Sequence, residues 1–231
     1  MERLDKCIAA TGRWSRKEAK ALIKAGRVKV GGQSPAGAED KVAEGTEITV
    51  DGRPISTEKY TYVMLHKPAG VVSSTEDPRE QTVLSLLPPA LRRIGLSPVG
   101  RLDKDTEGLL LLTNDGQLSH ALLSPAKHVD KVYYAQVEGQ PDEGDQAAFQ
   151  EGLTLGDGTV CLPAELTLLP EPNCCLVTLR EGKYHQVKRM LAARGKPVTY
   201  LKRLSMGPLT LDRSLPPGAF RLLTPEERAK L

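Results

Sequence analysis

Three carboxylates alternate along one short stretch of the sequence: Asp103, Asp105 and Glu107. Arg101 and Lys104 flank the first of them, so that Asp103 has a cation on either side. An ionised aspartate in such a setting can act as a nucleophile or as a general base. In an extended chain the three acids would share a face and could instead hold Mg²⁺ for phosphoryl chemistry. A solvated loop without any chemical role is the third interpretation.

The segment that follows this loop must position it. Leu109–Leu112 is a continuous apolar run, and a turn sequence, Asn114-Asp-Gly116, ends it. Such a run bounded by turn residues predicts a strand that is buried on both faces. A carboxylate that precedes a buried strand is held more firmly than one on a free loop, and catalysis needs that rigidity.

Composition sets limits on the class of protein. The chain has 231 residues, of which 39% are hydrophobic and 26% charged, as in an ordinary globular protein of one or two domains. No run approaches the roughly 18 apolar residues of a membrane span. The charged N-terminus lacks the apolar core of a secretory signal, and the four cysteines show no C-x-x-C spacing. We therefore expect a cytoplasmic protein with free thiols, no contact with membranes and no metal site.

The net charge of +3 conceals two basic zones. Residues 1–32 carry nine Lys or Arg against three acids, and residues 183–203 carry seven basic groups and no acid. The stretch 132–179 has eight acids and no Lys or Arg. This asymmetry favours a polyanion-binding face, although chance clustering is the alternative.

The first basic zone has the pattern of a helix pair. Leu4 and Ile8 share a helical face, and Gly12 is placed to end that helix. Ser15 and Glu18 then fit a capping box at the start of a second helix, with its own apolar stripe. A basic ridge lies largely off this stripe: Arg16, Lys17, Lys20, Lys24 and Arg27.

Short alternating segments, 27–30 and 47–50, follow the helix pair and predict strands. This order of elements resembles the S-four-type RNA-binding domain, named for a small-subunit ribosomal protein. The resemblance covers residues 1–58, with 53–60 as the linker. It implies that the basic ridge contacts RNA phosphates, which positions RNA without reading its bases.

Residues 59–231 predict a second domain with more strands than helices. Because there is no regular β-α-β alternation, we expect an α+β fold with a mixed or antiparallel sheet. The predicted strands are 62–65, 109–112, 131–139 and 176–179. The predicted helices are 83–87, ended by Pro88-Pro89, then 117–123, stopped by Pro125, then 144–152, and one that starts within 181–191.

Four segments of this second domain together resemble the pseudouridine synthases of the RsuA type. They are Gly100-Arg-Leu-Asp-Lys-Asp-Thr-Glu-Gly108 with the leucine run, Tyr62-Val-Met-Leu-His-Lys-Pro-Ala-Gly70, Lys131-Val-Tyr133 and Glu181-Gly-Lys-Tyr-His-Gln-Val-Lys-Arg-Met190. The closing segment 215–224 fits as well. Such enzymes detach a uracil ring from its ribose within RNA and rejoin it through carbon.

The resemblance implies roles for individual residues. Asp103 is the essential carboxylate, Lys188 its basic partner, and Tyr133 the tyrosine that stacks on the target base. Arg101 is placed to fill the stack that the flipped base vacates. His185 and Gln186 are expected to contact RNA; Lys67, at a strand end, could do so too or could be surface decoration.

The expected reaction is the isomerisation of one uridine in 16S rRNA, because the pair Tyr184-His185 resembles the small-subunit branch of these enzymes. The expected partner is that rRNA or a partly assembled small subunit, and the expected state is a monomer. No cofactor is implied, since the exchange of bonds is redox-neutral. Action on large-subunit rRNA is one alternative, and a non-catalytic RNA-binding assembly factor is another.

Overall fold

The computed structural model describes residues 1–43, 45–55, 58, 60–124 and 127–231. It forms two compact units: Met1–Thr61 with Leu87–Ser97, and Tyr62–Leu86 with Pro98–Leu231. The boundary that we placed between residues 58 and 59 touches positions outside the described ranges and stays a prediction. No helix in the described ranges is both long enough and apolar enough to cross a membrane.

The first unit contains the predicted helix pair, α1 (Leu4–Ala10) and α2 (Arg16–Lys24). The capping box is confirmed, because the side chain of Ser15 accepts from the Glu18 amide while Glu18 accepts from the Ser15 amide. Apolar residues from both helices and the nearby strands form one buried cluster. Its helical members are Leu4, Ile8, Ala19, Leu22 and Ile23.

The strands of this unit are short and antiparallel. β1 (Glu2–Arg3) pairs with β3 (Lys41–Val42), and β4 (Ile48–Val50) lies between β2 (Val28–Val30) and β5 (Arg53–Ile55). Placing the linker at 53–60 was therefore partly wrong. Ile55 is buried opposite Ile48, so this apolar side chain completes the core and keeps its segment in the sheet.

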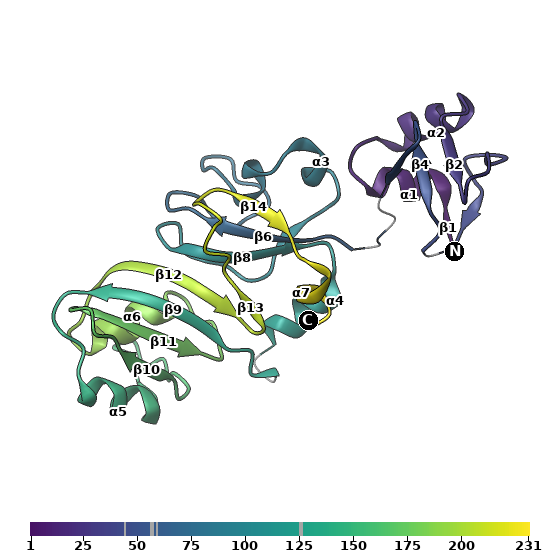
Figure 1. Ribbon diagram of the computed structural model, residues 1–231. Helices are drawn as coiled ribbons and strands as arrows, with labels where there is room; N and C mark the ends of the chain where they lie inside the picture. Colours follow the sequence, from purple (N-terminus) through teal and green to yellow (C-terminus); the bar gives the residue numbers. More distant parts are fainter. Residues whose placement is uncertain (44, 56–57, 59, 125–126) are drawn as a thin grey trace. The chain divides into compact units, whose positions relative to one another are not determined.

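The second unit is built on one mixed sheet, with strand order β10-β11-β9-β12-β8-β6-β14 (Figure 1). Every neighbouring pair is antiparallel except β12 and β8, which run parallel. The predicted mixed sheet and α+β class are confirmed. The strands are β6 (Tyr62–Lys67), β7 (Ser97–Pro98), β8 (Glu107–Thr113), β9 (Lys131–Val137), β10 (Glu165–Leu168), β11 (Cys174–Leu179), β12 (Val198–Met206), β13 (Leu209–Thr210) and β14 (Phe220–Leu222).

The parallel pair joins the two halves of the sheet at a close backbone contact. Gly108 on β8 lies opposite Arg203 on β12 and adopts a φ of +109°. A Cβ atom at Gly108 would come within 2.2 Å of the Arg203 carbonyl oxygen. Only glycine fits here, because both its backbone angle and its lack of a side chain are required. The glycine after Glu107 thus sets where the loop that carries Asp103 meets the sheet.

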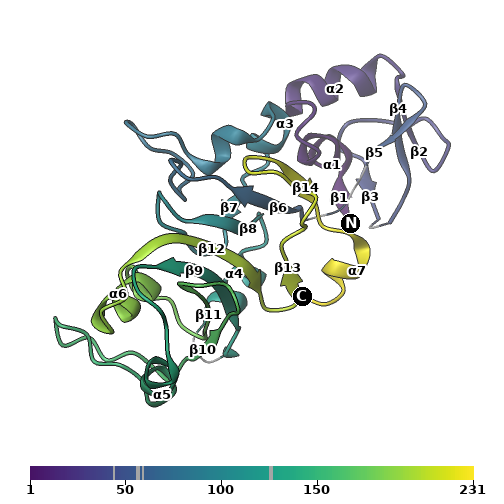
Figure 2. The same ribbon diagram turned by 60° about the vertical axis from the view of Figure 1, so that its left-hand side comes forward.

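Each half of the sheet has its own apolar core. On the half from β10 to β12, the helix α5 (Glu143–Glu151) lies beside β10 and α6 (Gln186–Ala193) beside β12 (Figure 2). Phe149 of α5 and Met190 of α6 are fully buried against strand residues. On the other half, Leu122 of α4 (Gly116–Leu123) packs with residues of β6 and β8. Leu109–Leu112 are all fully buried, which confirms the predicted central strand.

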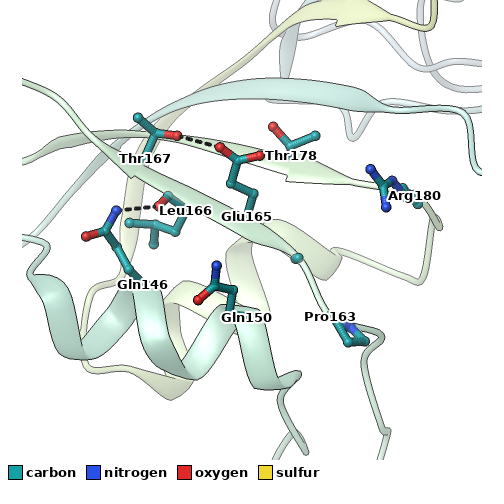
Figure 3. A pocket seen from close by; sticks show the side chains of 9 residues that line it. Gln146, Gln150, Pro163, Glu165, Leu166, Thr167, Thr178 and Arg180 are labelled. Carbon is teal, nitrogen blue, oxygen red and sulfur yellow. Dashed lines mark hydrogen bonds between the residues drawn. The ribbon is translucent and has the colours of Figure 1, made fainter.

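An open cleft of about 570 Å³ lies between α5 and β10 (Figure 3). Gln146 donates to the Leu166 carbonyl oxygen at 2.9 Å, and Thr167 donates to Glu165 at 3.3 Å. None of the site residues predicted from the sequence lines this cleft. Its polar groups serve to fasten α5 to the edge of the sheet.

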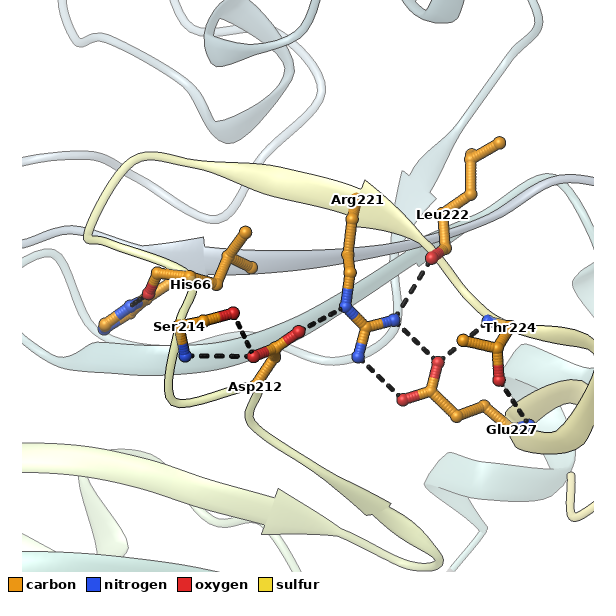
Figure 4. A network of polar contacts seen from close by, with 8 residues as sticks. His66, Asp212, Ser214, Arg221, Leu222, Thr224 and Glu227 are labelled. Atoms are coloured by element: carbon orange, nitrogen blue, oxygen red, sulfur yellow. Dashed lines mark hydrogen bonds and ion pairs between the residues drawn. The ribbon is translucent and has the colours of Figure 1, made fainter.

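The C-terminal segment is held by the guanidinium of Arg221 on β14 (Figure 4). Its Nε donates to Asp212 at 2.7 Å, and its two Nη groups donate to Glu227 at 2.7 and 2.8 Å. Glu227 lies in α7 (Pro225–Arg228) and also caps the amide of Thr224. One cation therefore links β14, the preceding loop and the final helix.

The predicted helices are present, and one further helix follows the first of them. Val83–Leu86 forms the short helix η1, which ends before Pro88-Pro89 as predicted, and Pro89 then opens the separate helix α3 (Pro89–Arg92). Proline suits the first turn of a helix, where its missing amide hydrogen has no partner to lose. α6 begins at Gln186, because residues 181–185 form a turn. The other helices lie where predicted, although Pro125 is outside the described residues.

Candidate active site

The loop that carries Asp103 is fixed by hydrogen bonds of its backbone to the segment after β6. The hydroxyl of Ser73 donates to the Leu102 carbonyl oxygen at 2.8 Å and accepts from the Leu102 amide at 3.1 Å. The Gly70 amide donates to the Lys104 carbonyl oxygen at 2.8 Å. A turn, in which the Thr106 amide donates to the Asp103 carbonyl oxygen at 3.1 Å, closes the loop. These bonds hold Asp103 just ahead of the buried strand β8.

The buried side chain of Lys67 holds the same loop through hydrogen bonds. Its ammonium donates to the carbonyl oxygens of Pro68, Lys104 and Thr106 at 3.0, 3.1 and 2.8 Å. The residue is fully buried, and this burial lowers its pKa to about 8. Our prediction that Lys67 contacts RNA is therefore wrong. The loop carbonyls take all three hydrogens of the ammonium, so Lys67 acts as a support.

Two side chains of the α6 region face the carboxylate of Asp103. Lys188 Nζ lies 3.3 Å from Oδ2, and His185 Nε2 lies 3.4 Å from Oδ1. The Asp103 side chain is 25% exposed, so the carboxylate can be reached from solvent. The structure thus brings together the three residues that the sequence motifs placed far apart in the chain. The Lys188 ammonium therefore places a positive charge directly beside this carboxylate.

The other two acids of the loop have partners of their own. Asp105 Oδ1 lies 2.5 Å from Lys188 Nζ, and this hydrogen bond lowers the pKa of Asp105. Glu107 accepts from the hydroxyl of Tyr200 at 2.8 Å. Across the described ranges, no three His, Cys, Asp or Glu side chains gather in a way that could hold a metal ion. The alternating carboxylates therefore do not form the cluster that the Mg²⁺ interpretation requires.

Gln186 is a structural residue of the turn before α6. Its side-chain amide donates to Glu181 at 2.6 Å, and its oxygen accepts from the Lys183 amide at 2.9 Å. Glu181 also accepts from the Leu162 amide at 2.9 Å and pairs with the Lys183 ammonium. Gln186 is buried and engaged, but it also lines the small cavity beside Asp103, so its contact with RNA stays a prediction.

His185 reaches Asp103 through an unusual backbone conformation. It precedes α6 with φ +46° and ψ +36°, the left-handed region that a non-glycine residue rarely adopts. The ring of Tyr184 stacks on the His185 ring with centroids 3.9 Å apart, and Tyr184 is 73% exposed. Strain of this kind persists where the surroundings fix the residue, which is common at functional sites.

Tyr133 and Asp103 line one cleft of about 600 Å³. Tyr133 is half-buried on β9, and Arg101 reaches the same cleft from the loop. A smaller cavity of about 80 Å³ adjoins Asp103, Tyr133 and His185. An aromatic ring beside a reachable carboxylate can hold a planar base next to the group that attacks its sugar.

Two buried cations of this cleft are absent from our sequence-based list. Lys131 on β9 and Arg203 on β12 both line it, and both are almost fully buried. Arg203 closes the second basic zone of the sequence and lies on β12, a strand that we did not predict. Without that strand, the sequence alone offered no reason to expect a buried cation at this position.

The basic ridge of the first unit is exposed along α2 and just after it. Some of its members already have acidic partners: Arg16 binds the buried carboxylate of Asp5 at 3.1 Å, and Arg27 binds Asp51 at 2.6 Å. Within the described ranges, Lys17 and Lys24 have no acidic partner. All five side chains remain open to a polyanion: Arg16, Lys17, Lys20, Lys24 and Arg27.

The sequence matches two known families. Residues 61–193 match the family described as RNA pseudouridylate synthase, and residues 2–48 match the S4 domain. The first match contains the whole loop that carries Asp103, Tyr133 and all of α6. The second contains the helix pair with its basic ridge.

Known proteins resemble the chain over nearly its full length. An uncharacterised RNA pseudouridine synthase of Bacillus subtilis, YtzG, is 47% identical, with 97% of this chain and 96% of the relative covered. Ribosomal small subunit pseudouridine synthase A of Pseudomonas aeruginosa is 44% identical, with 97% and 98% covered. A crystal structure of a pseudouridylate synthase superposes with a TM-score of 0.70 at 37% identity, covering 100% of this chain and 99% of that one.

Proposed function

Since this chain belongs to the RNA pseudouridylate synthase family, we propose that it converts one uridine of small-subunit (16S) rRNA to pseudouridine, with Asp103 as the essential carboxylate. The observation that carries the assignment of Asp103 is its position: it faces Lys188 and His185 at the mouth of a cleft lined by Tyr133. The substrate is supported by the relatives whose names specify the small ribosomal subunit.

Two chemical routes are open to Asp103, and both need it ionised. The carboxylate can attack the anomeric carbon of the ribose, or it can remove a proton from the sugar. In either route the bond between the ribose and uracil N1 breaks, the ring turns, and carbon 5 rejoins the ribose. Lys188 keeps a positive charge beside the carboxylate during these steps, and the His185 ring lies against its other oxygen.

The remaining cleft residues bind and orient the nucleotide. Tyr133 stacks on the base after it leaves the RNA helix, which costs a few kcal/mol of unstacking. Arg101 fills the vacated position, and His185 contacts the nucleotide. The basic ridge on and after α2 holds the neighbouring RNA through its phosphates.

The proposal extends to the organisation of the protein in the cell. Residues 1–58 act as the RNA-binding domain and residues 59–231 as the catalytic domain. The partner is free rRNA or a partly assembled small subunit, and the protein works as a monomer in the cytoplasm. No cofactor takes part, because the substrate supplies every bond that breaks or forms.

Mapping of pseudouridine tests this proposal. The full-length protein is incubated with transcripts of small-subunit rRNA, with large-subunit rRNA and with partly assembled small subunits. We expect one modified position in the small-subunit RNA, which D103N fails to produce and a chelator leaves unchanged. Modification of large-subunit RNA alone would contradict the assignment of small-subunit rRNA as the substrate. Loss of activity in the chelator would restore the Mg²⁺ interpretation. Binding without any modification would favour the non-catalytic assembly factor.

A further inference from the structure

Two buried cations lie side by side in the cleft that holds Asp103. Arg203 is 2% exposed and Lys131 is 7% exposed. Arg203 stands directly opposite Tyr133 in the antiparallel pairing of β12 with β9, so both side chains point to the same face of the sheet. Lys131 lies two residues before Tyr133 and shares this face. Both cations line the same cleft as Tyr133 and Asp103.

Neither cation has a carboxylate partner within the described part of the chain. Arg203 Nε donates to the Leu109 carbonyl oxygen at 2.8 Å, but its Nη2 has no hydrogen-bond partner there. Lys131 Nζ donates only to a carbonyl oxygen, that of Val129, at 3.2 Å. Burial, and then the charge of Arg203, lowers the pKa of Lys131. Unpaired buried cations are costly, so a fold that keeps two of them together has a use for positive charge at this place.

An RNA ligand offers two kinds of oxygen that could meet these cations: phosphate oxygens and the carbonyl oxygens of the base. A flipped nucleotide enters a pocket with its base first, while its phosphates stay on the backbone outside. Exposed or half-exposed cations of the cleft rim, Lys104 and Lys183, suit the phosphates. The deeply buried pair suits the base.

We propose that Arg203, with Lys131 beside it, forms a cationic floor that binds a carbonyl oxygen of the target uracil and stabilises the ring while it is detached from the ribose. This inference rests on the proposed function. When the bond between C1′ and N1 breaks, its electron pair stays with the ring, and the negative charge spreads onto the carbonyl oxygens. Re-attachment at C5 uses an electron pair of the ring, after which C5 loses its proton and N1 gains one.

The benefit of such a floor is larger for the detached ring than for the bound substrate. The intact base offers neutral carbonyl oxygens, whereas the detached ring is an anion. Interactions that strengthen along the reaction raise its rate, and fixed charges in a dry site do so without reorganisation. Asp103 acts on the sugar from one side, while the floor accepts the charge of the leaving base on the other.

The test compares two short RNAs that carry either uridine or 5-fluorouridine at the mapped position. Fluorine makes the ring a better leaving group but blocks the final proton loss, so loss of the original nucleotide is followed in single turnover. For R203M we expect the rate on uridine to fall about 10²-fold, the scale of one lost charge-stabilising donor. The rate on 5-fluorouridine should fall at least tenfold less, because its anion needs less help.

The ratio of the two rates within one preparation is independent of how much protein is folded, so a partly unfolded R203M still gives an answer. R203K should retain more of the wild-type ratio, and K131M should shift it in the same direction as R203M. K202M is the matched control, because Lys202 pairs with Tyr134 and points to the opposite face of β12. It should leave the ratio unchanged.

Three results would overturn parts of this account separately. Equal losses on both RNAs, with weaker binding and a salt dependence reduced by about one phosphate contact, would assign the cations to a phosphate instead. An unchanged R203M would remove any role in the reaction. An inactive wild-type protein on every RNA tested would contradict the proposed function itself, whatever the variants do.

Discussion

Lys188 Nζ lies 3.3 Å from a carboxylate oxygen of Asp103, although α6 and the catalytic loop are far apart in the sequence. The same ammonium lies closer to Asp105, at 2.5 Å. The Lys188 ammonium therefore contacts two carboxylates, and the exposed one, Asp105, holds it within reach of Asp103. This arrangement gives Asp105 a positioning role that its place in the loop did not reveal.

Replacing Lys188 with methionine should slow single-turnover isomerisation by about 10²-fold, because the charge beside Asp103 is lost. The pKa of Asp105, which the hydrogen bond from Lys188 lowers, should rise toward its ordinary value. Carboxyl NMR titration measures that rise, and K188R should restore most of the rate. A normal rate in K188M together with a raised Asp105 pKa would limit Lys188 to holding Asp105.

Replacing Lys67 with methionine should destabilise the protein without changing how it binds RNA. The variant removes the ammonium donor from the carbonyl oxygens of Pro68, Lys104 and Thr106, of which Lys104 keeps the Gly70 amide, at a cost of about 2–3 kcal/mol in the free energy of unfolding. Urea denaturation measures that loss. RNA affinity and its salt dependence should stay as in the wild type, and a reduced salt dependence would show that Lys67 meets phosphate after all.

Exchanging both unpaired lysines of the basic ridge for glutamine, in K17Q/K24Q, should weaken RNA binding. Each phosphate contact contributes close to one unit to the slope of log affinity against log salt, so the slope should fall by about 1.5. Titrations at several salt concentrations measure it. The control R213Q/K230Q removes the same charge from exposed positions of the second unit and should leave the slope unchanged. Equal effects in both variants would mean that only net charge matters.

The ion pairs of Arg221 with Asp212 and Glu227 should make the free energy of unfolding depend on pH in the acid range. Hydrogen bonds from Ser214 and Arg221 lower the pKa of Asp212 to about 2, below its unfolded value of about 3.9. A depressed folded pKa means that the stabilisation is fully present above about pH 4 and is lost as the pH falls toward 2. R221M should lower the melting temperature by about 3–6 °C near neutral pH and flatten this acid decline.

Melting curves from pH 7 to pH 2 test that expectation. The matched control is R180M, because Arg180 forms an exposed surface pair with Asp130. Such pairs contribute little, so R180M should follow the wild type. If the melting temperature of R221M falls with acid pH as steeply as that of the wild type, the stabilisation by Asp212 does not come from its pairing with Arg221.

Local sequence patterns were enough to predict the elements whose causes are local. The buried strand Leu109–Leu112 and the capping box of Ser15 and Glu18 followed from neighbours in the chain. The strand β5 was missed because a proline at position 54 is typical of a linker. The segment nevertheless joins the sheet, since Ile55 packs opposite Ile48 of β4.

Contacts between distant segments were beyond such patterns. Nothing near Lys67 in the sequence shows that its ammonium donates to the carbonyl oxygens of the loop that carries Asp103. Gln186 likewise donates to Glu181 only because the turn before α6 brings the two side chains together. The Gly108 and Arg203 contact joins strands that are separated by nearly half the chain. Resemblance to a family predicted that Asp103, Tyr133 and Lys188 share one site. The residues that hold this site in place, such as Lys67 and Gln186, were identified only from the structure.

The most direct test of the central claim compares D103N with D105N in single-turnover isomerisation of small-subunit rRNA. Both variants remove one charge next to Lys188, so they differ only in which carboxylate is lost. D103N should lose at least about 10³-fold in rate with RNA affinity intact, as expected for an essential nucleophile or base. D105N should stay within about tenfold of the wild type, since an exposed ion pair contributes at most about 1 kcal/mol. Pseudouridine formation by D103N at a rate close to that of D105N would contradict the assignment of Asp103.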